Sequence, residues 1–85
     1  MKSVAVTVNS TATLVVAADN KNRTVYLHNS GGAKIYLGGS DVTTANGYHL
    51  ANSESAEFFV PLNETLYGVV ATGTNVINVL TPDLD

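Results

Sequence analysis

The chain has 85 residues, enough for one small domain, and residues 1–85 are expected to fold as a single unit. It contains no cysteine, which excludes disulfides and thiolate metal sites as reinforcement of a small core and favours oligomerisation instead. The net charge of −3 and the lack of a basic run argue against nucleic-acid binding, and no apolar run has the roughly 18 residues of a membrane span.

Short runs of β-branched and aromatic residues, separated by Gly, Asn, Asp and Ser, predict strands along the whole chain. In chain order these are Ser3–Val8, Ala12–Ala17, Arg23–Asn29, Ala33–Gly38, Gly47–Leu50 (the weakest), Ser55–Leu62, Thr65–Ala71 and Asn75–Thr81. No window has a sustained helical period. The predicted fold is all-β: a small antiparallel β-sandwich, jelly-roll-like, of seven to eight short strands, with a frayed tail at 82–85.

The third and fourth predicted strands are expected to form a β-hairpin around a three-residue loop at 30–32. Because alternate residues of a strand share a face, an odd loop directs one apolar set toward the core, namely Val25, Leu27, Ile35 and Leu37. The opposite face of the hairpin then carries an outward patch of Tyr26, His28, Lys34 and Tyr36.

The last two predicted strands are expected to form a second hairpin around residues 72–74, with two apolar faces. One face holds Leu66, Val70, Val76 and Leu80, and the other holds Tyr67, Val69, Ile77 and Val79. The domain's own core covers one face. A partner chain is the expected cover for the other, with strand ends and loops as the alternative.

No catalytic or metal-binding pattern emerges, so neither an enzyme nor a cofactor is predicted. His28 and His49 do not have zinc-ligand spacing. Glu54 and Glu57 are three apart and point to opposite faces of a strand, which argues against a glycosidase pair. Residues 38–40 lack the ending of a phosphate-binding loop.

Aromatic side chains are the best candidates for an interface. Phe58 and Phe59 are adjacent, so one of them points inward and the other outward. The alternative for these rings is ordinary half-buried packing within the sheet. The full set of candidate interface residues is Tyr26, His28, Lys34, Tyr36, Phe59, Tyr67, Val69, Ile77 and Val79.

The order of several short motifs resembles that of the small β-structured virion proteins of tailed bacteriophages. The motifs are Asn22-Arg23 before a strand, Asn29-Ser30-Gly31, Tyr36-Leu37-Gly38, Val42-Thr43-Thr44-Ala45-Asn46-Gly47 and the Leu66-Tyr67…Gly73-Thr74 segment. They span about residues 12–80. The resemblance implies a capsid decoration (cement) protein or a head or tail fibre module, with no enzymatic activity and no metal.

The expected function is therefore that of a decoration protein that binds the outer capsid surface and stabilises it. Its partners would be the major capsid protein and further copies of itself, with a trimer as one candidate state. Assembly in the host cytoplasm would place it in the virion. The alternatives are a tail or neck component, and a glycan-binding module that uses Tyr36 and the loop contacts Asp41, Asn46 and Tyr48.

Overall fold

The computed structural model describes residues 1–82, and these residues form eight β-strands. The strands are β1 (Lys2–Val8), β2 (Thr13–Val16), β3 (Arg23–Asn29), β4 (Ile35–Gly38), β5 (Tyr48–Leu50), β6 (Ser55–Val60), β7 (Leu66–Val69) and β8 (Asn75–Thr81). All eight predicted strands are confirmed. Of the predicted tail at 82–85, residues 83–85 lie outside the described residues. No helix within the described part is long and apolar enough to cross a membrane.

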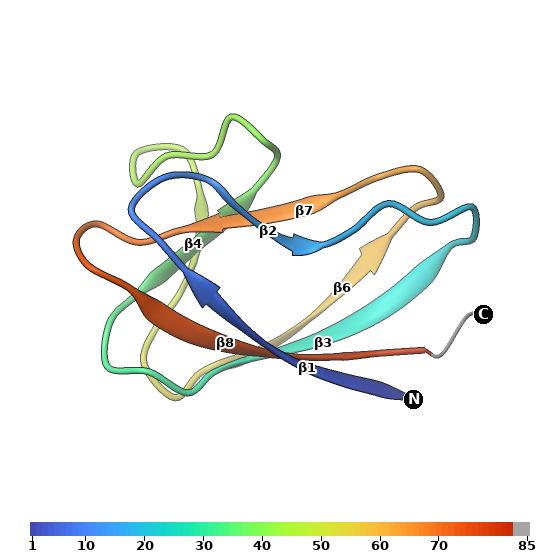
Figure 1. Cartoon of the computed structure of the whole chain (residues 1–85), viewed down its shortest axis with the longest axis horizontal. Helices are drawn as coiled ribbons and strands as arrows, with labels where there is room; N and C mark the ends of the chain where they lie inside the picture. Colours follow the sequence, from blue (N-terminus) through green and yellow to red (C-terminus); the bar gives the residue numbers. More distant parts are fainter. Residues whose placement is uncertain (83–85) are drawn as a thin grey trace.

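The strands form two antiparallel sheets that face each other across the core (Figure 1). The first sheet has the order β1-β8-β3-β6 and the second β2-β7-β4-β5. The pairs β1·β8, β2·β7, β3·β6 and β4·β5 are nested, so that the first strand pairs with the last and the two middle strands pair with each other. This architecture confirms the all-β sandwich, and the nesting is compatible with the predicted jelly-roll-like form.

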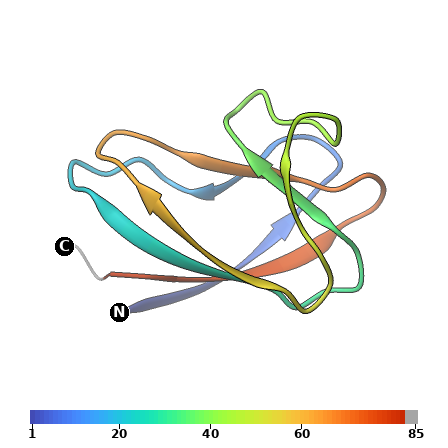
Figure 2. The same ribbon diagram turned by 180° about the vertical axis from the view of Figure 1, so that it is seen from behind.

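Both predicted hairpins are wrong. β3 pairs with β6 and β8, whereas β4 pairs with β5 and β7, so residues 30–34 carry the chain from one sheet to the other (Figure 2). The 70–74 segment does the same between β7 and β8. In a sandwich, a hairpin and a crossing connection can both direct the same alternate residues inward. The apolar pattern therefore could not distinguish between them.

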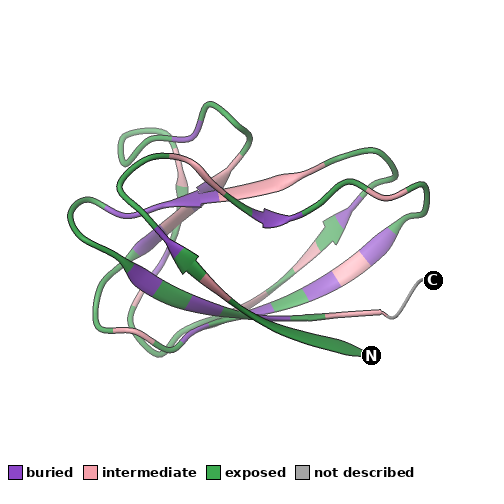
Figure 3. Cartoon of the chain, viewed as in Figure 1, coloured by how far each residue is buried: buried purple, intermediate pink, exposed green. Residues whose placement is uncertain are grey.

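The core lies between the sheets and is built from the alternate residues that the sequence marked. Val25, Leu27, Ile35 and Leu37 are all buried, as predicted. Figure 3 shows the resulting alternation of buried and exposed residues along β8. The interior cluster also includes Val8, Val15, Val16, Leu50, Val60, Val70, Ile77 and Val79. Its β-branched residues suit a pleated sheet whose outer face remains exposed.

A buried amide network closes one end of the sandwich. The Asn29 side chain is fully buried and donates to the carbonyls of Ala33 (2.7 Å) and Leu50 (2.9 Å). Its Oδ1 accepts from the Gly31 amide (3.1 Å) and from Asn75 Nδ2 (3.3 Å). Asn75 Nδ2 also donates to the Ala33 carbonyl (2.5 Å). The network joins the ends of β3, β5 and β8, where the ladders stop and backbone groups need partners.

Gly31 leaves the space that this network occupies. A Cβ at Gly31 would lie 1.2 Å from Asn75 Oδ1, whereas a Cβ at Gly32 would meet nothing within 4 Å. We expect Gly31→Ala to lower the free energy of unfolding by about 1–3 kcal/mol, because the buried Asn75 amide must move and lose hydrogen bonds. Gly32→Ala is the matched control and should change it by less than about 1 kcal/mol. Urea denaturation of both variants tests this, and equal losses would contradict it.

At the opposite end of β3, Arg23 ties two loops to the sandwich. Its guanidinium donates to the Ala17 carbonyl (2.7 Å) before β3 and to the Glu64 carbonyl (3.2 Å) before β7. Arg23 is only 7% exposed, and its Nε has no hydrogen-bond partner among the described residues. This nitrogen is buried away from solvent. The two hydrogen bonds of the guanidinium join the loop before β3 to the loop before β7 inside the protein.

The outer face of the second sheet is partly covered by the chain itself. Residues 39–47 form a compact loop held by the Val42 amide on the Gly39 carbonyl (3.0 Å) and the Gly47 amide on the Thr43 carbonyl (2.9 Å). A Cβ at Gly47 would lie 2.6 Å from Tyr36 Cβ, so the loop packs directly on β4. Val69 lies opposite Tyr36 in the ladder and is 4% exposed. The loop therefore covers this outer face at Tyr36, whereas the two-sided β7–β8 hairpin, for which a partner chain or strand ends and loops were the expected covers, does not exist.

Candidate interaction surface on the first sheet

Within residues 1–82, no loop covers the outer face of the first sheet in this way. Register places Leu80, Tyr26 and Glu57 in one row across β8, β3 and β6, beginning at Ser3 of β1. The next row contains Asn78, His28 and Ser55, beginning at Ala5. The outward positions of the four strands are Ser3, Ala5, Thr7, Thr24, Tyr26, His28, Ser55, Glu57, Phe59, Val76, Asn78 and Leu80.

Large apolar side chains gather at one end of this face. Tyr26 is 46% exposed and Leu80, directly opposite it in the ladder, is 37% exposed. Phe59 is 63% exposed and lies opposite Thr24, which makes it a diagonal neighbour of Tyr26 on the same face. We refer to Tyr26, Phe59 and Leu80 as the outer-face cluster.

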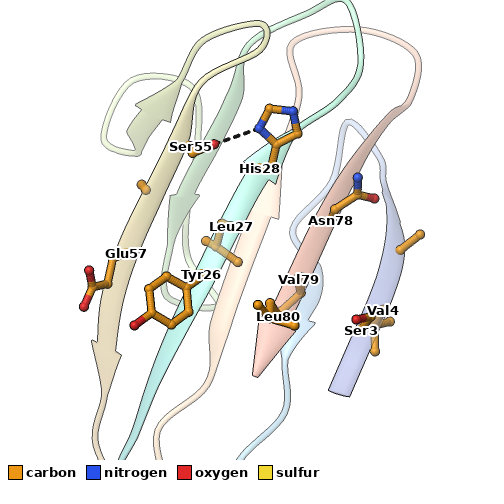
Figure 4. A pocket seen from close by; sticks show the side chains of 12 residues that line it. Ser3, Val4, Tyr26, Leu27, His28, Ser55, Glu57, Asn78, Val79 and Leu80 are labelled. Atoms are coloured by element: carbon orange, nitrogen blue, oxygen red, sulfur yellow. Dashed lines mark hydrogen bonds between the residues drawn. The ribbon is translucent and has the colours of Figure 1, made fainter. Parts of the chain in front are cut away.

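A shallow groove of about 970 Å³ crosses the four strands beside this cluster (Figure 4). The small outward residues Ser3 and Ala5 are among those that line it. Tyr26, Leu80 and Glu57 stand at one end, with His28, Ser55 and Asn78 toward the other. The groove is thus mainly apolar, with one row of polar groups.

His28 Nδ1 and Ser55 Oγ lie 2.8 Å apart in that polar row. A serine–histidine contact is one part of a nucleophilic site, but the histidine also needs a group that orients its second nitrogen. Among residues 1–82, no carboxylate forms that hydrogen bond, and the pair lies on an open sheet face. The contact links the imidazole on β3 to β6.

The structure separates the predicted interface residues into three groups. Tyr26, His28 and Phe59 share the outer face of the first sheet. Tyr36 and Tyr67 are half-buried on the second sheet, and Lys34 is exposed in the 30–34 connection, so the predicted patch of Tyr26, His28, Lys34 and Tyr36 does not exist.

Three predicted interface residues are buried, so their assignment to an interface is wrong. Ile77 (0% exposed) and Val79 (4%) are part of the core between the sheets. Val69 (4%) is buried on the outer side of the second sheet. None of them presents a surface to a partner. A single β7–β8 hairpin would place the inward residues of β8 on the same face as the outward residues Tyr67 and Val69 of β7, whereas the two strands lie in different sheets.

The predicted loop contacts do not form one site either. Tyr36 and Tyr48 point to opposite faces of the second sheet, since Tyr36 pairs with His49 and Tyr48 with Leu37. Tyr48 instead meets Phe58 edge-on, with ring centroids 5.4 Å apart. The Asn46 side chain is engaged within its own loop, accepting from the Thr43 amide (2.7 Å) and donating to the Asp41 carbonyl (3.4 Å).

Several groove residues were not among the predicted interface residues, namely Ser3, Ser55, Glu57, Asn78 and Leu80. Leu80 alone had a signal, because it belongs to the alternate set opposite Ile77 and Val79. That signal was ambiguous since both alternate sets of β8 are largely apolar. Serine and asparagine at outward strand positions are as common on an ordinary solvated face as in a groove, so the sequence alone does not indicate which of the two they form.

Comparison of the chain with protein-family models, with curated proteins and with solved structures found no match. The functional argument therefore rests on the surface itself and on the motif resemblance.

Proposed function

We propose that the protein is a structural component of a tailed-bacteriophage virion: a capsid decoration protein that binds the outer capsid surface and stabilises it. The outer-face cluster is the contact surface, and the major capsid protein is the partner. The protein acts mechanically. By burying apolar surface against neighbouring coat subunits, it holds them together and raises the cost of separating them.

The single observation that carries this proposal is the exposed outer-face cluster. Tyr26 and Phe59 are of the aromatic type that dominates binding energy in protein interfaces. Glu57 is the only Asp, Glu, Lys or Arg among the outward positions of the four strands. A face with so little charge can be desolvated against a partner at small electrostatic cost.

The motif resemblance supplies the kind of partner, which the surface alone does not specify. The charged residues make up 13% of the chain, about half the usual share for globular domains. Low charge allows many copies to lie close together on one particle without strong repulsion. These features favour a surface protein that is present in many copies on one particle over a free enzyme.

Binding to phage particles tests the proposal. Removing both aromatic rings with Tyr26→Ser and Phe59→Ser should weaken attachment by at least about 100-fold, because exposed aromatic anchors contribute roughly 2 kcal/mol or more each. Co-sedimentation with particles that lack the protein gives the affinity. Tyr48→Ser is the matched control, since Tyr48 is also a well exposed tyrosine (62%) but lies away from the first sheet's outer face.

Failure of the wild-type protein to bind particles, or equal binding by the double variant and the wild type, would refute this assignment. A glycan array separates the alternative function. Carbohydrate binding that is lost with Tyr48→Ser, together with no particle attachment through Tyr26 and Phe59, would indicate a receptor-binding module instead.

A further inference from the structure

The sandwich has four edge strands, and three of them are protected against pairing with another chain. β2 carries a register irregularity between Leu14 and Val16. β5 has only three residues. β6 carries Glu57 near its middle and is followed by Pro61. The ring contact between Tyr48 of β5 and Phe58 of β6 also joins these two edge strands. Irregularities, shortness, charge and proline are the devices by which proteins protect sheet edges.

β1 has none of these devices along its central residues. It is a seven-residue strand, Lys-Ser-Val-Ala-Val-Thr-Val, that pairs continuously with β8 and, within the part of the chain that the structure describes, with no other strand. Half of its backbone N–H and C=O groups therefore point away from the sheet. Its first four residues are exposed, and Figure 3 shows this exposed stretch at the margin of the sandwich.

Apolar side chains flank this free edge. Val4 belongs to the inward-facing set of β1, opposite Val79, yet it is 40% exposed. Leu14 of β2 is 44% exposed, and both residues line an opening of about 330 Å³ between the two sheets. A strand added beside β1 would cover this opening as well as satisfying the backbone groups.

The sequence of β1 is suited to pairing with itself. In an antiparallel arrangement centred on Ala5, Val4 of one copy lies opposite Val6 of the other, and Ser3 lies opposite Thr7. Valine pairs and serine–threonine pairs are favourable cross-strand neighbours. Lys2 of each copy lies opposite Val8, so the two ammonium groups are on the order of 20 Å apart. Parallel in-register pairing would instead place Lys2 against Lys2, which is unfavourable.

We propose that two copies of this chain associate through β1, related by a two-fold axis at Ala5. The first sheets of the two copies then form one continuous eight-stranded sheet. Their outer faces lie side by side, which doubles the surface that carries the outer-face cluster. The association closes at two copies, because each β1 has a single free edge. It is a property of the free protein and does not depend on the proposed capsid function.

Paired charge substitutions at positions 3 and 7 test both the partner and the register. Ser3→Lys with Thr7→Lys places like charges opposite each other at both ends of the interface. Ser3→Glu with Thr7→Glu does the same with negative charges. The dimer dissociation constant of each of these variants alone should be at least about tenfold higher than that of the variant Ser3→Lys with Thr7→Glu, whose charges are complementary across the axis. An equimolar mixture of the first two variants should restore the dimer.

Sedimentation velocity over a concentration series measures the association, and circular dichroism verifies that each variant is folded. Ser40→Lys with Thr44→Lys, in the exposed 39–47 loop, adds the same charge away from β1 and should leave the dimer intact. A wild-type monomer at millimolar concentration, a trimer, or a Lys/Lys variant that dimerises as well as the Lys/Glu variant would each overturn the proposal. Because no capsid is present, these outcomes leave the particle-binding test independent.

Discussion

Replacing Asn29 with alanine should lower the free energy of unfolding by about 3–5 kcal/mol, since buried backbone groups and a second amide lose their partners. The side chain is fully buried and makes four hydrogen bonds, to the backbone of Gly31, Ala33 and Leu50 and to Asn75. A domain of 85 residues has a total free energy of unfolding of about 4–13 kcal/mol. If the protein lies in the lower half of that range, the substitution removes most of its stability. The melting temperature should fall by about 15 °C or more.

Asn78→Ala is the matched control for this prediction. Asn78 lies on β8, three residues after Asn75, but its side chain is exposed on the outer face. Its removal should change the unfolding free energy by less than about 0.5 kcal/mol. Thermal denaturation followed by circular dichroism compares the two variants. A similar, small loss in both would show that the amide network contributes little to stability.

Replacing Ile77 with alanine should lower the free energy of unfolding by about 2–5 kcal/mol, because it leaves a cavity in the centre of the core. Ile77 is fully buried between the sheets. Phe59→Ala, which truncates a side chain that is 63% exposed, should change stability by less than about 1 kcal/mol. Chemical denaturation of the isolated protein measures both effects.

Ile77→Val provides a graded measurement if the alanine variant does not fold. It should cost about 0.5–1.5 kcal/mol, since it removes one methylene from the same position. If Ile77 instead lay at an interface with a partner, both substitutions would leave the isolated chain as stable as the wild type. That result would contradict the placement of Ile77 in the core and return it to the set of interface residues.

Strand positions were predictable because their determinants are local. β-branched runs end at Gly, Asn and Ser, and the bounds of β3 and β8 were predicted without error. Alternation also identified the inward residues of β3 and β4. Which strand pairs with which is a different question, since residues 30–34 can turn back within one sheet or cross to the other while Leu27 and Ile35 still face inward.

The candidate surface was only partly predictable for the same reason. Parity placed Tyr26 and His28 outward and indicated that one of Phe58 and Phe59 joins them; Phe59, the residue included in the predicted interface, does share their face. Val69 is buried opposite Tyr36, on which the 39–47 loop packs, and no spacing in the sequence indicates this packing. The neighbours of Tyr26 in the groove come from β1, β6 and β8, and these contacts depend on pairing between distant parts of the chain.

Because the strands are nested, the first sheet of the protein forms late in synthesis. Lys2 pairs with Thr81, so the first sheet lacks a central strand until β8 has been synthesised. Pairing of residues this far apart requires closing nearly the longest loop that the chain allows, and such topologies fold in milliseconds to seconds instead of microseconds. During translation, β1 remains an unpaired, nearly uncharged segment until β8 has been made. Newly made chains are therefore most prone to aggregate with one another before β8 leaves the ribosome.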